Sequence, residues 1–293
     1  MLPQRLKIAI VVVLAVINAG LLFLVTQKMA ESEVTAGEVI STPTTSTPTV
    51  TEEPEVEPGG PQGLVIAGDG SILRIFGGSC DGGEAGPGIS VSSDTGGSFD
   101  DVRLPEDVRS VLSLTARNAD DLDVVAASDD CEPVRYVSTD GGDFWVAEED
   151  ADEWFLDPRT KRVTSPRGRL NPGCTDNLVL SAVTDRVARV FCASGVLLGT
   201  NDTGRNWARF GFLDDIRAAA FARERKGYAL APDGGCATGS YSSEDSGRTW
   251  TATGCLDAAP ARAMAARGDL VAAIAGDDVY VSEDSGRNWT KAS

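Results

Sequence analysis

The sequence contains no histidine, and this absence excludes catalytic centres that depend on an imidazole, such as Ser-His-Asp triads. Aromatic residues make up only 6% of the chain, and lysine occurs 5 times against 21 arginines. The six cysteines include no Cys-x-x-Cys pair, so a zinc site would have few ligands to draw on. We therefore expect neither a metal site nor a cofactor.

Positive charge is also scarce. The chain has a formal net charge of -18, and the 23 basic and 37 acidic residues that follow Gln62 give that part a net charge of -14. So acidic a domain is a poor partner for nucleic acid or for anionic lipid headgroups. The preference for arginine over lysine fits GC-rich coding, so we expect a high-GC Gram-positive bacterium as the source.

One long apolar run lies near the N-terminus, at Ile8–Thr26, and is long enough to cross a hydrocarbon core of ~30 Å. Arg5 and Lys7 precede it and acidic residues follow it, which keeps residues 1–7 in the cytoplasm and places the remainder outside the membrane. We expect an uncleaved signal anchor at residues 8–26; a cleaved signal peptide is the alternative. Residues 27–63, rich in Thr, Pro, Ser and Glu, are expected to form an extracytoplasmic linker.

The pattern Ser/Thr-x-Asp-x-Gly-x-x-Trp/Phe occurs five times and takes up four of the five tryptophans. Each copy predicts a β-hairpin turn in which the Asp carboxylate accepts backbone N–H groups and Gly adopts a positive φ. The spacings between the Asp residues are 46, 62, 43 and 39 residues, typical of repeats with four strands each, which indicates an all-β β-propeller. The copies are Ser92, Asp94, Gly96 and Phe99; Ser138, Asp140, Gly142 and Trp145; Thr200, Asp202, Gly204 and Trp207; Ser243, Asp245, Gly247 and Trp250; and Ser282, Asp284, Gly286 and Trp289.

These copies resemble Asp boxes, the bacterial neuraminidase repeat of sialidases, sortilin-type receptors and photosystem II assembly factor propellers. The resemblance covers residues 64–293 and implies that the aspartates are structural, at the turn between the third and fourth strands of each blade. We expect five four-stranded blades, with residues 148–172 as an insertion between the second and third. Six blades is the alternative, in which the insertion is a degenerate blade.

The cysteines follow the second strand of a blade or precede a first strand, so all six lie opposite the repeated turns. An even number outside a membrane favours disulfides. We predict the pairs Cys174–Cys192, Cys236–Cys255 and Cys80–Cys131.

The segment from Glu148 to Arg169 departs from the repeat, with an acidic run, two aromatics and five basic residues. Insertions on a rigid scaffold often carry function, so it is the candidate partner-binding segment. The structural alternative is a hairpin whose acidic and basic arms pair with each other while Trp154 plugs the disulfide-bearing face of the propeller. The candidate contact residues are Trp154, Phe155, Arg159, Lys161, Arg162, Arg167 and Arg169.

We therefore expect a non-catalytic binding or scaffold module for a protein or cell-envelope component. A sialidase-like glycoside hydrolase, active or degenerate, is one alternative, because Leu73-Arg74-Ile75-Phe76 resembles the element that carries the first arginine of the sialidase triad. The proline of that element is missing. An assembly factor for a membrane complex is another alternative.

Overall fold

The computed structural model describes residues 62–80, 86–148, 152–157, 160, 162–174, 176–233 and 235–292. The chain divides into two compact units, Met1–Pro54 and Glu55–Ser293, and all described residues belong to the second. The expected signal anchor and most of the linker thus lie outside the described residues. Within the described ranges the regular elements are strands, and no helix there could cross a membrane.

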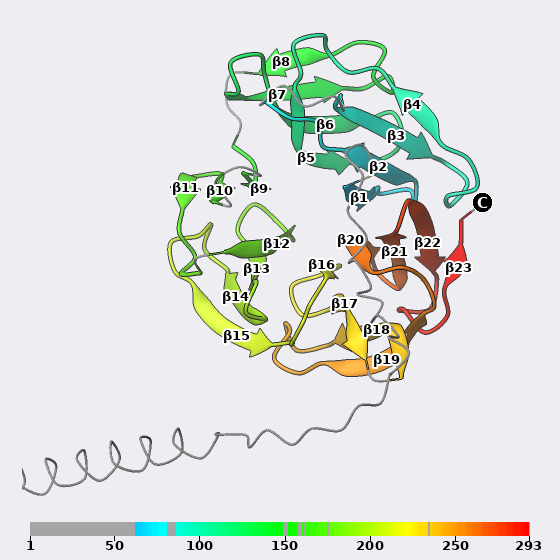
Figure 1. Cartoon of the computed structure of the whole chain (residues 1–293). Coiled ribbons are helices and arrows are strands. Elements are labelled where there is room, and N and C mark those ends of the chain that lie inside the picture. Colours follow the sequence, from blue (N-terminus) through cyan, green and yellow to red (C-terminus); the bar gives the residue numbers. More distant parts are fainter. Residues whose placement is uncertain are drawn as a thin grey trace, which may run out of the picture. The chain divides into compact units, whose positions relative to one another are not determined.

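The described strands form six sheets, or blades, around a common centre (Figure 1). Five blades have four antiparallel strands and blade 3 has three. Blades 1 to 3 consist of β1 (Gly63–Ile66), β2 (Ile72–Phe76), β3 (Gly88–Ser92) and β4 (Asp100–Val102); β5 (Ser110–Ala116), β6 (Leu122–Ala127), β7 (Pro133–Ser138) and β8 (Val146–Glu148); and β9 (Phe155–Leu156), β10 (Val163–Ser165) and β11 (Gly168–Leu170). Blades 4 to 6 consist of β12 (Asn177–Ala182), β13 (Ala188–Cys192), β14 (Val196–Thr200) and β15 (Ala208–Phe212); β16 (Ala218–Phe221), β17 (Gly227–Asp233), β18 (Cys236–Ser243) and β19 (Thr251–Leu256); and β20 (Ala261–Arg267), β21 (Leu270–Ala275), β22 (Asp278–Ser282) and β23 (Thr290–Lys291).

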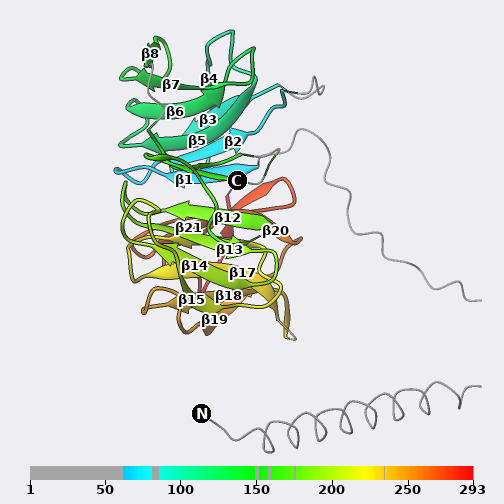
Figure 2. The same ribbon diagram turned by 90° about the vertical axis from the view of Figure 1, so that its left-hand side faces the viewer.

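Each blade runs outward in sequence order, with its first strand at the centre. Burial follows this order: all four residues of the inner strand β16 are buried, whereas all three residues of the outer strand β8 are exposed. In Figure 2 the outer strands β8 and β19 lie at opposite rims of the ring. The inner strand β16 is therefore part of the interior, whereas the outer strand β8 faces solvent.

The preferred count of five blades is wrong, and the six-bladed alternative is correct. Residues 148–172 are not a loop insertion, because they include the three strands β9–β11 of blade 3. Val163 and Trp154 are buried against Ala188 and Val190 of blade 4, so the segment contributes to the core. The three strands are only 2, 3 and 3 residues long, which is how a sixth blade fits into the interval.

The repeated turns share one hydrogen-bond pattern. In blade 4, the Thr200 hydroxyl donates to Asp202 Oδ1 (2.8 Å) and accepts from the N–H of Gly204 (3.0 Å). Asp202 Oδ1 also accepts from the N–H of Asn206 at 2.9 Å. Equivalent bonds close the turns at Asp94, Asp140, Asp245 and Asp284. The exposed carboxylates are thus held by the turn itself, and these bonds lower the pKa of Asp94, Asp202 and Asp284 to about 2.

Each repeated turn packs against the blade before its own. The motif glycines have positive φ, and a Cβ on Gly142 would collide with Val102 of blade 1 while one on Gly247 would collide with Leu197 of blade 4. The motif aromatics fill the same interfaces: Trp145 packs in the cluster between blades 1 and 2. Glycine is therefore required here both for the turn and for the close approach of two blades.

The ring closes between blades 6 and 1 without a shared strand among the described residues. The closure is a hydrophobic cluster in which Leu64, Ile66 and Ile72 of blade 1 pack against Ile274 and Val281 of blade 6, with the motif residue Phe99 at its edge. Apolar burial of this kind is worth roughly 25 cal/mol per Å² of buried surface. Packing alone thus joins the first and last blades.

The three predicted disulfides are present. Cys174–Cys192 lies within blade 4 and Cys236–Cys255 within blade 5, whereas Cys80–Cys131 joins blades 1 and 2. All six cysteines lie at strand ends or connections opposite the repeated turns. None of the three bonds crosses the closure between blades 6 and 1, so they do not replace the missing shared strand.

Candidate functional site

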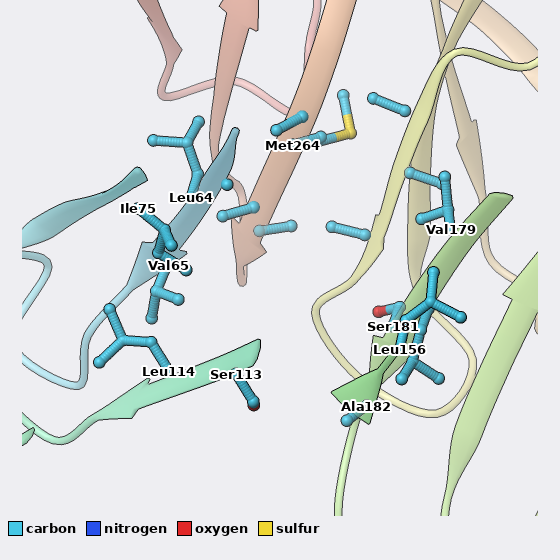
Figure 3. Close-up of a pocket in the computed structure, with 18 of the residues that line it drawn as sticks. Leu64, Val65, Ile75, Ser113, Leu114, Leu156, Val179, Ser181, Ala182 and Met264 are labelled. Carbon is cyan, nitrogen blue, oxygen red and sulfur yellow. The ribbon is translucent and has the colours of Figure 1, made fainter. Parts of the chain in front are cut away.

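The innermost strands of all six blades surround a central cavity of about 480 Å³. Most of the side chains around it are apolar: Leu64 and Val65 of β1, Leu114 of β5, Val179 of β12 and Met264 of β20 lie around it in Figure 3, while polar groups provide about half of the exposed wall. On the side of blades 5 and 6 the wall is largely alanine, because the inner strands β16 and β20 are alanine-rich. A cavity of this size, lined mainly by apolar side chains, is typical of a binding site.

The polar chemistry of the cavity wall is limited. Among its described lining residues Arg262 is the single charged one, and no tyrosine, aspartate or glutamate is present. Arg262 is held at one end, where its Nη2 donates to Asp277 Oδ1 at 2.8 Å. The described residues also contain no group of three or more acidic or cysteine side chains placed to hold a metal ion.

Arg74, which resembles the first sialidase arginine by sequence, does not line this cavity. Its Nε donates to the hydroxyl of Ser90 at 3.0 Å, and its guanidinium carbon lies 3.7 Å from the centroid of the Phe99 ring. The guanidinium is therefore stacked on the motif aromatic of its own blade, where it contributes to packing.

The candidate contact residues of the segment 148–169 separate into two groups. Trp154 and Phe155 are buried, at 3% and 6% exposure, and both line the central cavity. Arg162, Arg167 and Arg169 are exposed on blade 3. Arg159 and Lys161 lie outside the described residues. The two aromatics are thus interior residues, whereas the three described arginines face solvent.

Trp154 has a defined structural environment. Its ring lies edge-on to the Trp207 ring with centroids 6.1 Å apart, and its Nε1 donates to the carbonyl oxygens of Thr184 and Asp185, each at 3.1 Å. Because both partners belong to blade 4, Trp154 joins blades 3 and 4. The structural alternative placed Trp154 on the disulfide-bearing face, whereas Trp154 fills the interface between blades 3 and 4, next to the repeated turn at Gly204.

The interface between blades 2 and 3 differs from the other five. Hydrophobic clusters join every other neighbouring pair, but none of the clusters of described residues joins these two. On blade 2, Arg135 Nε donates to Asp123 Oδ1 at 2.9 Å and its Nη1 lies 2.8 Å from Glu148 Oε2. Burial raises the pKa of Glu153, which precedes β9, and the charge of Asp123 adds to this, while Arg135 opposes it. We call this polar interface the seam.

Sequence reasoning missed the ion pairs of the seam, because Asp123 and Arg135 lie on separate strands whose register the motif does not define. It also missed Phe144, which precedes the motif aromatic Trp145. The corresponding residues in the other turns are Ser98, Asn206, Thr249 and Asn288, and the side chain of each donates to the second carboxylate oxygen of its motif aspartate. A comparison of the five copies would have singled out Phe144.

No family model and no curated protein matches this sequence. Among solved structures, YCF48 from Cyanidioschyzon merolae shares 15% identity over 74% of this chain and 80% of that one, with a TM-score of 0.45. YCF48 bound to a D1 peptide shares 16% over 86% and 74%, and the GH74 enzyme of Niastella koreensis shares 14% over 79% and 38%, both with TM-scores of 0.31. This chain thus spans 38% of the GH74 enzyme. The six radial sheets themselves establish that the chain contains a β-propeller.

Proposed function

We propose that this protein is a membrane-anchored, extracytoplasmic β-propeller that binds a protein or a cell-envelope component without catalysis, and that its repeated turns are Asp boxes with a structural role. The central cavity is the observation that carries this proposal. Its wall offers apolar surface, a few hydroxyl groups and one arginine, a composition suited to holding a ligand.

Glycoside hydrolysis usually needs a pair of carboxyl groups on either side of the bond that breaks. A sialidase-like site would in addition need converging arginines and a tyrosine. The described wall of the cavity has no carboxylate, no tyrosine and a single arginine, and Arg74 is stacked on Phe99. These observations favour binding over hydrolysis.

The proposed location depends on two features. Three disulfides suit an oxidising compartment outside the cytoplasm. The apolar run Ile8–Thr26, with basic residues before it, supports an anchor that leaves the propeller on the outer side of the membrane.

The test is in-cell cross-linking followed by affinity purification of the full-length protein. A deletion of residues 154–169 is unsuitable because it would remove blade 3. Thr115 is a better position, since it is exposed and lines the cavity, so Thr115→Trp should fill space there without disturbing the core. Thr251, exposed on the outer strand β19, provides the matched control Thr251→Trp.

We expect a reproducible set of adducts with the wild type and with Thr251→Trp, and its loss with Thr115→Trp. Identical adducts from both variants would contradict binding in the cavity. Release of free sugar from labelled envelope glycans by the purified protein would contradict the absence of catalysis. The location is tested by adding protease to intact cells whose outer layers are permeable to it. A propeller that stays protected from the protease would contradict the proposed location.

A further inference from the structure

The repeated turns cover the outer strands of the preceding blade at every interface except one. Turns are present on blades 1, 2, 4, 5 and 6, and blade 3 has no copy of the motif. The flank of blade 2 that faces blade 3 is therefore not covered by such a turn, and blade 3 supplies no motif aromatic to fill the interface. This is the seam.

The residue three positions after the motif aromatic also differs between blade 2 and the other blades. At the other blades it meets the turn of the next blade: a Cβ on Gly96 would stand 2.7 Å from Ala292, Thr253 lies 3.5 Å from a Cβ on Gly286, and Phe210 packs with Trp250. At blade 2 the same position is Glu148, which is exposed and paired with Arg135. Glu148 is therefore a charged residue at a position where each of the other blades has a neutral residue in contact with the next turn.

The outer hairpin of blade 2 also carries unusual exposed apolar surface. Phe144 is 68% exposed and Val146 is 52% exposed, whereas the residues equivalent to Phe144 in the other turns are polar. Side chains alternate along a strand, so Val146 points away from its neighbour Trp145, which packs against blade 1. Val146 and its cross-strand partner Val137 therefore lie on the flank that faces the seam.

Blade 3 presents an open edge on the other side of the seam. Its outermost strand is β11, which pairs with β10 alone, and the blade has no fourth strand among its described residues. An unpaired edge strand is a template for another strand. Arg167 and Arg169 are exposed at this edge, Arg162 is exposed just before β10, and no described carboxylate lies within ion-pair distance of any of the three.

We propose that the seam is a docking site, separate from the central cavity, for an extended acidic segment of a partner protein. The segment adds to β11 as the missing fourth strand of blade 3 and pairs its carboxylates with Arg162, Arg167 and Arg169. Strand addition provides main-chain hydrogen bonds, and arginine binds carboxylates through paired N–H groups. Leu170 of β11 packs toward blade 4, so its neighbour Arg169 points toward blade 2. The acidic side chains that pair with Arg169 therefore face the seam, where their methylene groups contact Phe144 and Val146, and the alternate apolar side chains of the segment face blade 4. An acidic segment fits because these arginines are unpaired in a domain that is otherwise acidic.

The probe is a fluorescein-labelled octapeptide of alternating glutamate and valine, titrated with the full-length protein in detergent and followed by fluorescence anisotropy. Two control peptides replace glutamate with lysine or interrupt the strand with two prolines. The protein variants are the double charge reversal Arg167→Glu/Arg169→Glu and the substitution Phe144→Asn. Phe144→Asn introduces the residue found at this position in two other turns, so the fold should tolerate it. Phe212→Ser is the matched control, because Phe212 is 47% exposed on blade 4, away from the seam.

We expect the glutamate peptide to bind at least about tenfold more tightly than either control peptide, a difference of about 1.4 kcal/mol. The double reversal should bind the glutamate peptide at least about tenfold more weakly than the wild type. Phe144→Asn should weaken binding by a smaller factor, and Phe212→Ser should leave the affinity unchanged. Hydrogen exchange at the backbone amides of Gly168–Leu170 should slow when the peptide binds. Equal binding of the three peptides, equal binding by the double reversal, or unchanged exchange at β11 would each overturn the proposal. Thr115 lies on the same flank of blade 2 as Asp123 and Val137, so a cavity variant on another blade serves as the control. Ala182 of blade 4 is exposed and lines the cavity, and Ala182→Trp should bind the probe normally, which separates this test from that of the proposed function.

Discussion

The indole N–H of Trp145 donates to the backbone carbonyl of Arg103 across the interface between blades 2 and 1, at 2.7 Å. Trp207, Trp250 and Trp289 stand at the same position of their repeats, yet their Nε1 atoms are buried and have no hydrogen-bond partner among the described residues. One repeated side chain therefore serves two roles: all four tryptophans supply packing, and Trp145 adds a hydrogen bond between blades.

This difference predicts unequal effects of the same substitution. Trp145→Phe should destabilise the fold by about 1 kcal/mol more than Trp250→Phe, because only the first loses a satisfied hydrogen bond. Both variants lose similar ring volume, so each acts as the control for the other. Urea unfolding followed by circular dichroism measures the two free energies of unfolding. Equal losses would show that the bond to Arg103 contributes nothing.

Phe144 offers a stabilising substitution. Phe144→Asn should raise the free energy of unfolding by roughly 0.5–1 kcal/mol, because the new amide can donate to Asp140 as Asn288 donates to Asp284 at 2.6 Å. The reciprocal change Asn288→Phe should destabilise by a similar amount. A loss of stability in Phe144→Asn would mean that the phenyl ring is held by contacts that the turn pattern does not explain.

Acid should weaken the fold through the turn aspartates. Hydrogen bonds from the turn lower the pKa of Asp94, Asp202 and Asp284 to about 2, below the value of about 3.9 in an unfolded chain. Their contribution is complete above the unfolded value and is lost as the pH falls from about 4 toward 2. Unfolding midpoints in urea measured from pH 7 to pH 2 should show this decline, and Asp284→Asn should make it shallower. Parallel pH profiles for this variant and the wild type would contradict the prediction.

The disulfides should contribute different amounts to the free energy of unfolding. Cys80–Cys131 closes 51 residues and joins two blades, while Cys236–Cys255 closes 19 residues within one blade. The chain-entropy relation gives about 4 kcal/mol for the first and about 3 kcal/mol for the second. Paired serine substitutions, compared by urea unfolding, should reproduce this order. The reverse order would indicate that strand pairing in blade 5 needs its disulfide more than the contact between blades 1 and 2 needs its own.

The sequence predicted the architecture best where the repeat is present. In the last blade the motif begins at Ser282, the final residue of β22, and β23 (Thr290–Lys291) directly follows the motif aromatic Trp289. The motif defines a hairpin, and strand alternation then sets the neighbouring strands. Cysteine positions relative to the predicted strands gave the three disulfides for the same reason.

Blade 3 could not be predicted in this way. It has no motif, its strands are too short to show alternation, and an acidic run precedes its aromatics, so Trp154 resembled a surface residue. Burial of Trp154 depends on Ala188 and Val190, which are distant in sequence. The seam was missed because it is defined by a turn that blade 3 lacks. The uncovered flank of blade 2 can be identified only by comparison with the other interfaces.

The closure of the ring has a consequence for how the protein could be rebuilt. In the described part of the chain every sheet consists of strands that are consecutive in sequence, and the described residues of blades 6 and 1 meet through a cluster of apolar side chains. A circular permutant that opens between any two four-stranded blades and joins the original ends would keep every strand-to-strand hydrogen bond. The strand pairing of the propeller is therefore independent of where the chain is opened between two blades, which a ring fastened by a shared strand would not allow.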